Sequence, residues 1–147
     1  ETFSKSDSDV KDGMDISLCS IKTNSDKTVT VKWAGANNSL WYFSGSLFHD
    51  IKAHKQTIGK TESPSDFPTH EFQLKAGDSL YLYTDGFADQ FGGPRGKKYK
   101  SKKLQETISE IISKPAAEQK STLDTVFENW KGSLEQIDDV TVIGIIL

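Results

Sequence analysis

The chain has 147 residues, of which 35% are hydrophobic and 27% are charged, so it can bury one core of ordinary size. Its net charge of −3 and its pI of about 5.6 argue against electrostatic attraction of the whole protein to nucleic acid, although a local basic patch stays open. No apolar run approaches the ~20 residues of a membrane helix and the polar start holds no signal peptide, so we expect a cytoplasmic domain without membrane contact.

The chain begins with a polar segment. Residues 1–12 have no apolar periodicity and are interpreted as a flexible arm or linker before a domain over residues 13–147. The first residue, Glu1, is not a methionine, which suggests a fragment of a longer protein. The single cysteine, Cys19, excludes an internal disulfide. Since no positive side chain lies beside it, we expect a buried, reduced thiol rather than a nucleophile.

Two β-hairpins are predicted in the first third of the chain. Apolar and polar residues alternate over residues 29–33, and the turn-prone segment 24–27 separates them from a strand-like run at 16–19. Residues 40–43 and 47–51 are two further apolar runs around a Ser-Gly turn. Each pair of runs predicts two antiparallel strands.

A long loop and two strands follow. Residues 54–68 contain one glycine and two prolines among many polar residues, which predicts a loop. Phe72 and Leu74 mark a short strand that a turn closes. Residues 79–84 are apolar or aromatic on both faces, as expected for a strand that is covered on both sides.

Helices are predicted only in the last third of the chain. Apolar residues at helical spacing after Ser101 predict one helix, and Pro115 both ends it and suits the first turn of the next, which Gly132 caps. Residues 140–147 are apolar on both faces and predict a final buried strand. A sheet packed on another sheet, with helices outside, buries two such strands, so the predicted class is α+β.

Carboxylates stand at the ends of both doubly apolar strands. Asp85-Gly86 follows residues 79–84, and Asp138-Asp139 precedes the final strand. A carboxylate at the junction of a rigid strand and a loop is held firmly yet stays open to an ion, and oxygen ligands suit hard ions such as Mg²⁺ or Mn²⁺. The alternative is structural, because Asp-Gly is a common turn and an acidic pair before a strand is often only solvated.

Four short motifs occur in order along the chain. They are AGANNSLW at residues 34–41, GDSLYLYTDG at 77–86, ADQFGG with NWKG at 88–93 and 129–132, and IDDVTVIG at 137–144. Together they resemble the metal-dependent protein phosphatases of the 2C type, in the branch of the bacterial SpoIIE-type serine phosphatases. The first motif more often has Ala-Gly-His in that family, and the third resembles a variant often fused to sensory or repeat modules.

The resemblance implies a double β-sandwich flanked by helices, in αββα layers, with two Mn²⁺ or Mg²⁺ ions at one end. Asp85 and Asp138 match metal-ligand aspartates of the family, Asp139 fits a supporting role beside the ion, and Gly86 lets the chain turn away sharply there. The ions would activate a water for hydrolysis of phosphoserine or phosphothreonine in a protein substrate. No protein nucleophile is then needed, which agrees with the absence of a recognisable Ser-His pair. An upstream sensory or regulatory domain in a bacterial signalling protein is the expected context.

The sequence departs from the family in one important respect. The family's first motif, Asp-x-x-Gly-His-Gly, supplies an aspartate that bridges both ions, and no Gly-His-Gly occurs here. Asp12-Gly13 does not replace it, because it precedes a segment that matches a later part of the family. We therefore expect the first strands and two long helices to lie upstream, and this fragment to be inactive alone and prone to self-association.

Two other functions remain in view. A degenerate phosphatase fold could serve as a non-catalytic protein-interaction module, and the upstream sequence would distinguish it from an enzyme. Binding of nucleic acid through the basic stretch at residues 95–103 is disfavoured by the acidic total charge.

The remaining candidates for chemistry are interpreted as structural or solvated. The histidines lack metal-like spacing and are expected on the surface or in loops, namely His49, His54 and His70. The tryptophans are expected in the core, namely Trp33, Trp41 and Trp130. Two aspartates are assigned structural roles, namely Asp78 and Asp89. The basic stretch, with six cations in nine residues, is expected to be solvated, namely Arg95, Lys97, Lys98, Lys100, Lys102 and Lys103.

Overall fold

The computed structural model describes residues 13–59 and 64–147, so the arm expected over residues 1–12 lies outside the described residues. Its strands are β1 (Gly13–Met14), β2 (Ser17–Thr23), β3 (Val29–Gly35), β4 (Leu40–Ser44), β5 (Leu47–Ile51), β6 (Ile58–Gly59), β7 (His70–Leu74), β8 (Ser79–Tyr83), β9 (Phe91–Gly92), β10 (Lys97–Lys98) and β11 (Val142–Ile146). Its helices are α1 (Gly86–Asp89), α2 (Ser101–Ile111) and α3 (Ala116–Lys131).

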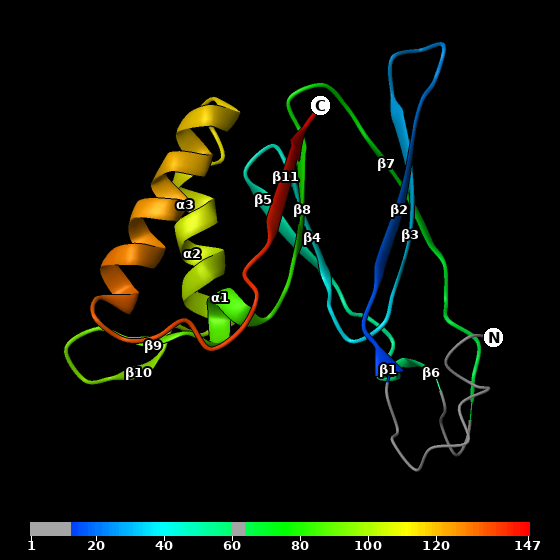
Figure 1. The fold of residues 1–147 in the computed structure, drawn as a ribbon. Coiled ribbons are helices and arrows are strands. Elements are labelled where there is room, and N and C mark those ends of the chain that lie inside the picture. The colour runs from blue at the N-terminus through cyan, green and yellow to red at the C-terminus, as the bar shows by residue number, and fades with distance from the viewer. Residues whose placement is uncertain (1–12, 60–63) are drawn as a thin grey trace.

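Two antiparallel sheets pack face to face, and helices α2 and α3 cover the outer face of one of them (Figure 1). The covered sheet has the strand order β11-β8-β4-β5, and the other has the order β2-β3-β7. Two small pairs, β1-β6 and β10-β9, complete the sheets. The prediction of an α+β sandwich with helices outside is confirmed, and the described part holds three of the four expected layers.

Both predicted hairpins are present. Strands β2 and β3 pair with Cys19 opposite Trp33, and the backbone N–H of Asn24 donates to the carbonyl of Thr28 at 2.8 Å to close the turn. Strands β4 and β5 turn at Gly45, whose positive φ of 59° suits glycine. Within the described part of the loop expected at residues 54–68, Ile58–Gly59 form β6, which the sequence did not predict.

The first core lies between the two sheets. Alternate residues of β3 point inward, and Val31 and Trp33 meet Leu40 and Leu80 from the facing sheet in a cluster closed to solvent. Burying each such side chain stabilises the fold by about 1.5–3 kcal/mol. Cys19 lies half-buried at this core, where burial raises the pKa of its thiol and so disfavours the reactive thiolate.

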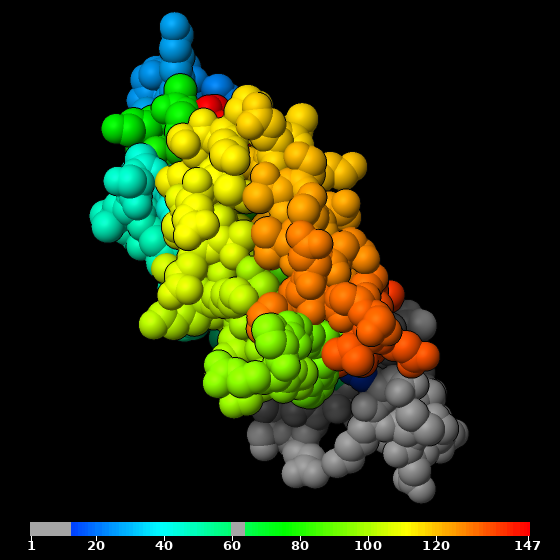
Figure 2. Space-filling view, turned by 90° about the vertical axis from the view of Figure 1, so that its left-hand side faces the viewer, coloured from blue at the N-terminus to red at the C-terminus, as the bar shows by residue number. Residues whose placement is uncertain are grey.

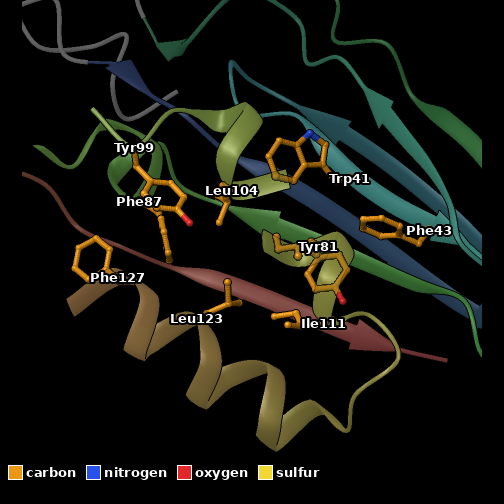
Figure 3. Close-up of a cluster of buried hydrophobic side chains, with 10 residues drawn as sticks. Trp41, Phe43, Tyr81, Phe87, Tyr99, Leu104, Ile111, Leu123 and Phe127 are labelled. Atoms are coloured by element: carbon orange, nitrogen blue, oxygen red, sulfur yellow. The ribbon is translucent and has the colours of Figure 1, made fainter. Parts of the chain in front are cut away.

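The second core lies between the helices and the sheet (Figure 3). It is built from aromatic side chains of β4, β8, α1, α3 and the segment before α2, together with aliphatic side chains of α2 and α3, namely Trp41, Phe43, Tyr81, Phe87, Tyr99, Leu104, Ile108, Ile111, Leu123 and Phe127. The Tyr81 hydroxyl donates to Oε1 of the buried Gln119 at 2.7 Å, so α3 is tied to β8 by a polar bond inside an apolar layer.

The last strand does not lie where the sequence predicted. Strand β11 was expected to be covered on both faces, but it forms the free edge of its sheet, and Ile143 is 49% exposed. The doubly covered strands are β8 and β4 instead. Strand β2 is likewise a free edge, where Leu18 is 66% exposed. Within residues 13–59 and 64–147, no helix has both the length and the hydropathy to cross a bilayer.

Two of the four edge strands, β2 and β11, lie on the same side of the sandwich. Tyr42 of β4 stacks on His49 of β5 and on Phe72 of β7, with ring centroids 4.3 and 4.6 Å apart, so β7 faces the β4-β5 side. Because β3 separates β2 from β7, β2 faces the opposite side, where β11 lies. We call this side, formed by β2 and β11, the open edge.

Candidate functional site

The two acidic segments predicted from the sequence are brought side by side. Thr84 holds them together, because its Oγ1 donates to the carbonyl of Asp139 at 2.8 Å and accepts from the backbone N–H of Thr141 at 2.9 Å. The backbone N–H of Thr84 also donates to the carbonyl of Thr141 at 3.0 Å. Asp85 therefore leaves β8 directly beside the Asp138-Asp139 pair that enters β11, at the end of the sheet near α1 (Figure 1).

Gly86 makes this close approach between the segments possible. A Cβ atom at this position would lie 2.5 Å from the carbonyl oxygen of Asp139, closer than real Cβ contacts allow. Any other residue would push the two segments apart. The sequence predicted a sharp turn at Gly86, and the structure adds that its missing side chain leaves room for the acidic segment.

The carboxylates at this junction are exposed and make few bonds of their own. Asp85 stands at the N-terminus of α1 without a side-chain capping bond. Oδ1 of Asp138 accepts from the backbone N–H of Asp139 at 2.7 Å, and Nε2 of Gln136 donates to the carbonyl of Asp138 at 2.8 Å. Most carboxylate oxygens therefore remain free to bind a cation.

The carboxylates at this junction are of the ligand type that a hard divalent ion prefers, but they are too few to complete its coordination shell. Carboxylate oxygens are the ligands that Mg²⁺ and Mn²⁺ prefer. Across residues 13–59 and 64–147, however, no group of three or more His, Cys, Asp or Glu side chains is arranged to hold a metal ion. Asp85 and Asp138 can therefore supply only part of a coordination shell.

A second polar group lies on the helix-facing side of the sheet. Burial, and secondarily the carboxylate of Asp50, raise the pKa of Tyr83, so this phenol keeps its proton. The Nε1 of Trp41 and the Oδ1 of Asp50, on paired residues of β4 and β5, are buried without a hydrogen-bond partner.

The residues assigned structural roles behave largely as predicted. Asp78 is buried, and its carboxylate accepts from the backbone N–H groups of Gly45 and Lys75 at 2.8 and 3.0 Å, so it fastens two turns. One expectation was wrong. A Ser-His pair does occur, because Nε2 of His54 lies 2.7 Å from Oγ of Ser65. Both are exposed in a loop far along the chain from the acidic segments, and the pair fastens that loop.

The basic stretch is only partly free. Lys98 forms an ion pair with Asp89 at 2.7 Å, and the ammonium of Lys103 lies 3.9 Å from the ring centre of Trp130. The other four cations are exposed and have no ion pair among the described residues, namely Arg95, Lys97, Lys100 and Lys102. In Figure 2 the residues from α1 to β10 (green) and the segment before β11 (orange-red) lie at the same end of the molecule.

Sequence reasoning missed two residues that organise this end of the fold. Thr84 was counted only as the end of a strand, although a hydroxyl directly before Asp-Gly was the available signal. Gln90 lay inside a recognised motif but received no role, and the structure shows it fully buried between α1 and the acidic segment. Neither contact is local in sequence, so neither could be read from spacing.

The chain is similar to known proteins both in sequence and in fold. The family model of Stage II sporulation protein E (SpoIIE) matches residues 5–146. The SiaA-PP2C domain of Pseudomonas aeruginosa superposes with a TM-score of 0.74 and 28% identity, covering 80% of this chain and 46% of that one. Curated protein sequences gave no significant match.

Two structures from Bacillus subtilis show the same fold. The phosphatase domain of the cell fate determinant SpoIIE, presoaked with Mn, gives a TM-score of 0.62 at 18% identity, covering 90% of this chain and 56% of that one. The PP2C phosphatase domain of SpoIIE with a fragment of its regulatory domain gives 0.59 at 19% identity, covering 80% and 34%. This chain thus spans only about half or less of each solved chain.

The matched solved structures are PP2C phosphatase domains, so the sandwich described above is the corresponding part of the PP2C phosphatase fold. The family model covers nearly the whole chain, including the acidic segments and the motifs between them. This chain belongs to the SpoIIE family.

Proposed function

We propose that this chain is one part of a protein serine/threonine phosphatase domain that hydrolyses phosphoserine or phosphothreonine with a metal-activated water. The observation that carries this proposal is the pair of hydrogen bonds made by the Thr84 hydroxyl to the carbonyl of Asp139 and the backbone N–H of Thr141. These bonds hold Asp85 beside Asp138 and Asp139 in a member of the SpoIIE family. Membership of the family supports this chemistry, and the bonds of Thr84 hold two carboxylates at the junction of β8 and β11.

The proposed roles follow from the geometry of this junction. Asp85 and Asp138 would ligate Mn²⁺ or Mg²⁺, Asp139 would support them through its backbone, and Gly86 would keep the segments close. Two such ions supply a water of lowered pKa and neutralise charge on the phosphoryl oxygens. The Mn presoak of the B. subtilis phosphatase domain is consistent with this choice of ion.

The biological setting is proposed from the same relatives. The B. subtilis SpoIIE structure includes a fragment of a regulatory domain, which supports an upstream regulatory or sensory domain in a longer protein here. The substrate is proposed to be a phosphorylated protein in the bacterial cytoplasm. Neither nucleic acid nor a membrane is part of the proposal.

The test is an assay of a polypeptide extended upstream to include the family's first motif. We expect Mn²⁺-dependent hydrolysis of an aryl phosphate and of a phosphoserine peptide, abolished by a chelator and restored by excess Mn²⁺. A phosphotyrosine peptide is the control for selectivity. Full activity in chelator would reject the metal mechanism.

One observation favours a second function. The described residues hold only part of a coordination shell, as a degenerate phosphatase fold would. In that case the domain would act as a protein-interaction module. The extended polypeptide would then bind its phosphoprotein or regulatory partner without turnover at any Mn²⁺ concentration.

The exposed cations provide a further prediction about substrate capture. Reversing the charges of Arg95, Lys97 and Lys100 in the extended polypeptide should raise the KM for a phosphopeptide severalfold at low salt, because these cations border the acidic end and attract an anionic substrate. The effect should fade as salt is raised above about 0.15 M. Reversing Lys120 and Lys114, near the other end of α3, is the control. A KM that stays unchanged at every salt concentration would remove this role.

A further inference from the structure

We propose that Gln90 is a positioning residue for the acidic site, because its buried amide anchors the loop that carries Asp138. The inference rests on the proposed function for its link to metal binding, but the anchoring can be measured without any metal. Gln90 belongs to the ADQFGG motif, which the proposed phosphatase chemistry left without a role.

The amide nitrogen of Gln90 bonds to two carbonyl groups, whereas its Oε1 is buried without a hydrogen-bond partner. The side chain is 0% exposed, and its Nε2 donates to the carbonyl of Phe91 at 3.0 Å and to the carbonyl of Glu135 at 2.9 Å. Glu135 precedes Asp138 by three residues in a loop without helix or strand. The Gln90 amide is buried, and a buried donor left without an acceptor is costly, so the bond to Glu135 holds the loop at this point.

The main chain around Gln90 is fixed from the other side by Trp130. The indole Nε1 of Trp130 donates to the carbonyl of Gln90 at 3.0 Å, and the backbone N–H of Gly93 donates to the carbonyl of Trp130 at 2.8 Å. A Cβ at Gly92 would lie 1.9 Å from that same carbonyl, so only glycine allows the contact. The ADQFGG and NWKG motifs therefore contact each other directly and connect α1 to the C-terminal end of α3.

Asp138 thus lies between two anchors. Gln90 holds the loop at Glu135, and Thr84 holds it at Asp139. Between these two points, the side chains of Gln136 and Asp138 bond only to residues one or two positions away in the sequence. Releasing the Gln90 anchor leaves Asp138 tethered on one side, which widens the range of positions it takes relative to Asp85.

A second glutamine provides a matched control. Gln119 is also buried, and its Nε2 donates to the carbonyls of Ile112 and Lys114 at 3.2 and 2.9 Å. It lies near the N-terminus of α3, whereas Trp130 lies near the C-terminus of that helix. Gln90→Met and Gln119→Met each remove two amide-to-carbonyl bonds, and Gln119→Met also removes the bond from the Tyr81 hydroxyl, which makes it a stringent control. Only Gln90→Met touches the acidic loop.

The first arm of the experiment uses the 147-residue chain without metal. Hydrogen exchange measured by mass spectrometry should show faster exchange over residues 133–141 in Gln90→Met by about tenfold, with no change there in Gln119→Met. Trp130→Phe keeps the ring and removes only the bond to the Gln90 carbonyl, so it should give a smaller increase. This milder variant decides the question if Gln90→Met fails to fold. Equal exchange of the loop in the wild type and in every folded variant would overturn the proposal.

The second arm measures Mn²⁺ affinity of the extended polypeptide by electron paramagnetic resonance of free Mn²⁺. Gln90→Met should weaken binding about 10-fold to 100-fold, whereas Gln119→Met should change it less than about twofold. Saturating Mn²⁺ should restore most of the turnover of Gln90→Met. Undiminished affinity in Gln90→Met would contradict the link to the metal. Absence of Mn²⁺ binding by the wild type would instead refute the proposed function, and the first arm would still decide the anchoring.

Discussion

The 147-residue chain alone is expected to hydrolyse an aryl phosphate at least about 10³-fold more slowly than the polypeptide extended upstream. The bridging aspartate of Asp-x-x-Gly-His-Gly is absent from the sequence, and the part of the chain with described structure offers no group of three metal-ligating side chains. Mg²⁺ readily keeps several waters, so weak binding of one ion to Asp85 or Asp138 is compatible with this result. A two-ion site that orients an attacking water is not.

The measurement compares both polypeptides at equal concentration in excess Mn²⁺, with phosphate release as the readout. Circular dichroism and thermal unfolding serve as controls, because a silent chain must be shown to be folded. Adding the missing segment as a separate polypeptide tests whether activity returns by association. Comparable turnover by both chains would mean that the catalytic residues lie within residues 1–147 and that the site is misplaced here.

Replacing Asp85 or Asp138 by asparagine in the extended polypeptide should lower Mn²⁺-dependent turnover by about 10²-fold or more, because each change removes a charged ligand. The fold should persist. Both side chains are exposed and make at most one bond to the protein, so the free energy of unfolding should change by no more than about 0.5 kcal/mol.

Substitutions of two other aspartates distinguish the loss of a metal ligand from the loss of stability. Asp89→Asn breaks one exposed ion pair with Lys98 and should leave turnover nearly unchanged. Asp78→Asn weakens bonds to two turns and should lower the free energy of unfolding by about 1–3 kcal/mol, while activity per folded molecule is kept. Equal loss of activity from all four substitutions would show that a stability effect had been mistaken for ligation.

The predictions that held were those that rest on short-range patterns. Period-two alternation over residues 29–33 gave β3, and helical spacing between Ser101 and Pro115 gave α2. Pro115 and Gly132 stand at the two ends of α3, since each has a backbone preference that acts locally. The pairing of β8 with β11 was not predicted, because nothing in the pattern of either strand indicates its neighbour.

The predictions that failed required knowledge of spatial neighbours. Residues 142–146 have no polar face, yet nothing in their pattern tells whether a strand lies beside them. The pairing of β1 with β6 joins two-residue strands that are too short to leave a periodic signal. Thr84 and Gln90 act through carbonyl groups more than forty residues away, so their roles become visible only in three dimensions.

The exposure of apolar residues on β11 depends on whether the open edge is covered. Ile143 and Ile146 of β11 border a groove of about 690 Å³ that runs between this strand and α3. They are exposed here, but a strand added beside β11, from a longer polypeptide or from a second copy of the chain, would reduce the exposure of both side chains. Tolerance of polar substitutions at these two positions therefore depends on whether a further strand pairs with β11, and not on the sequence of β11 alone.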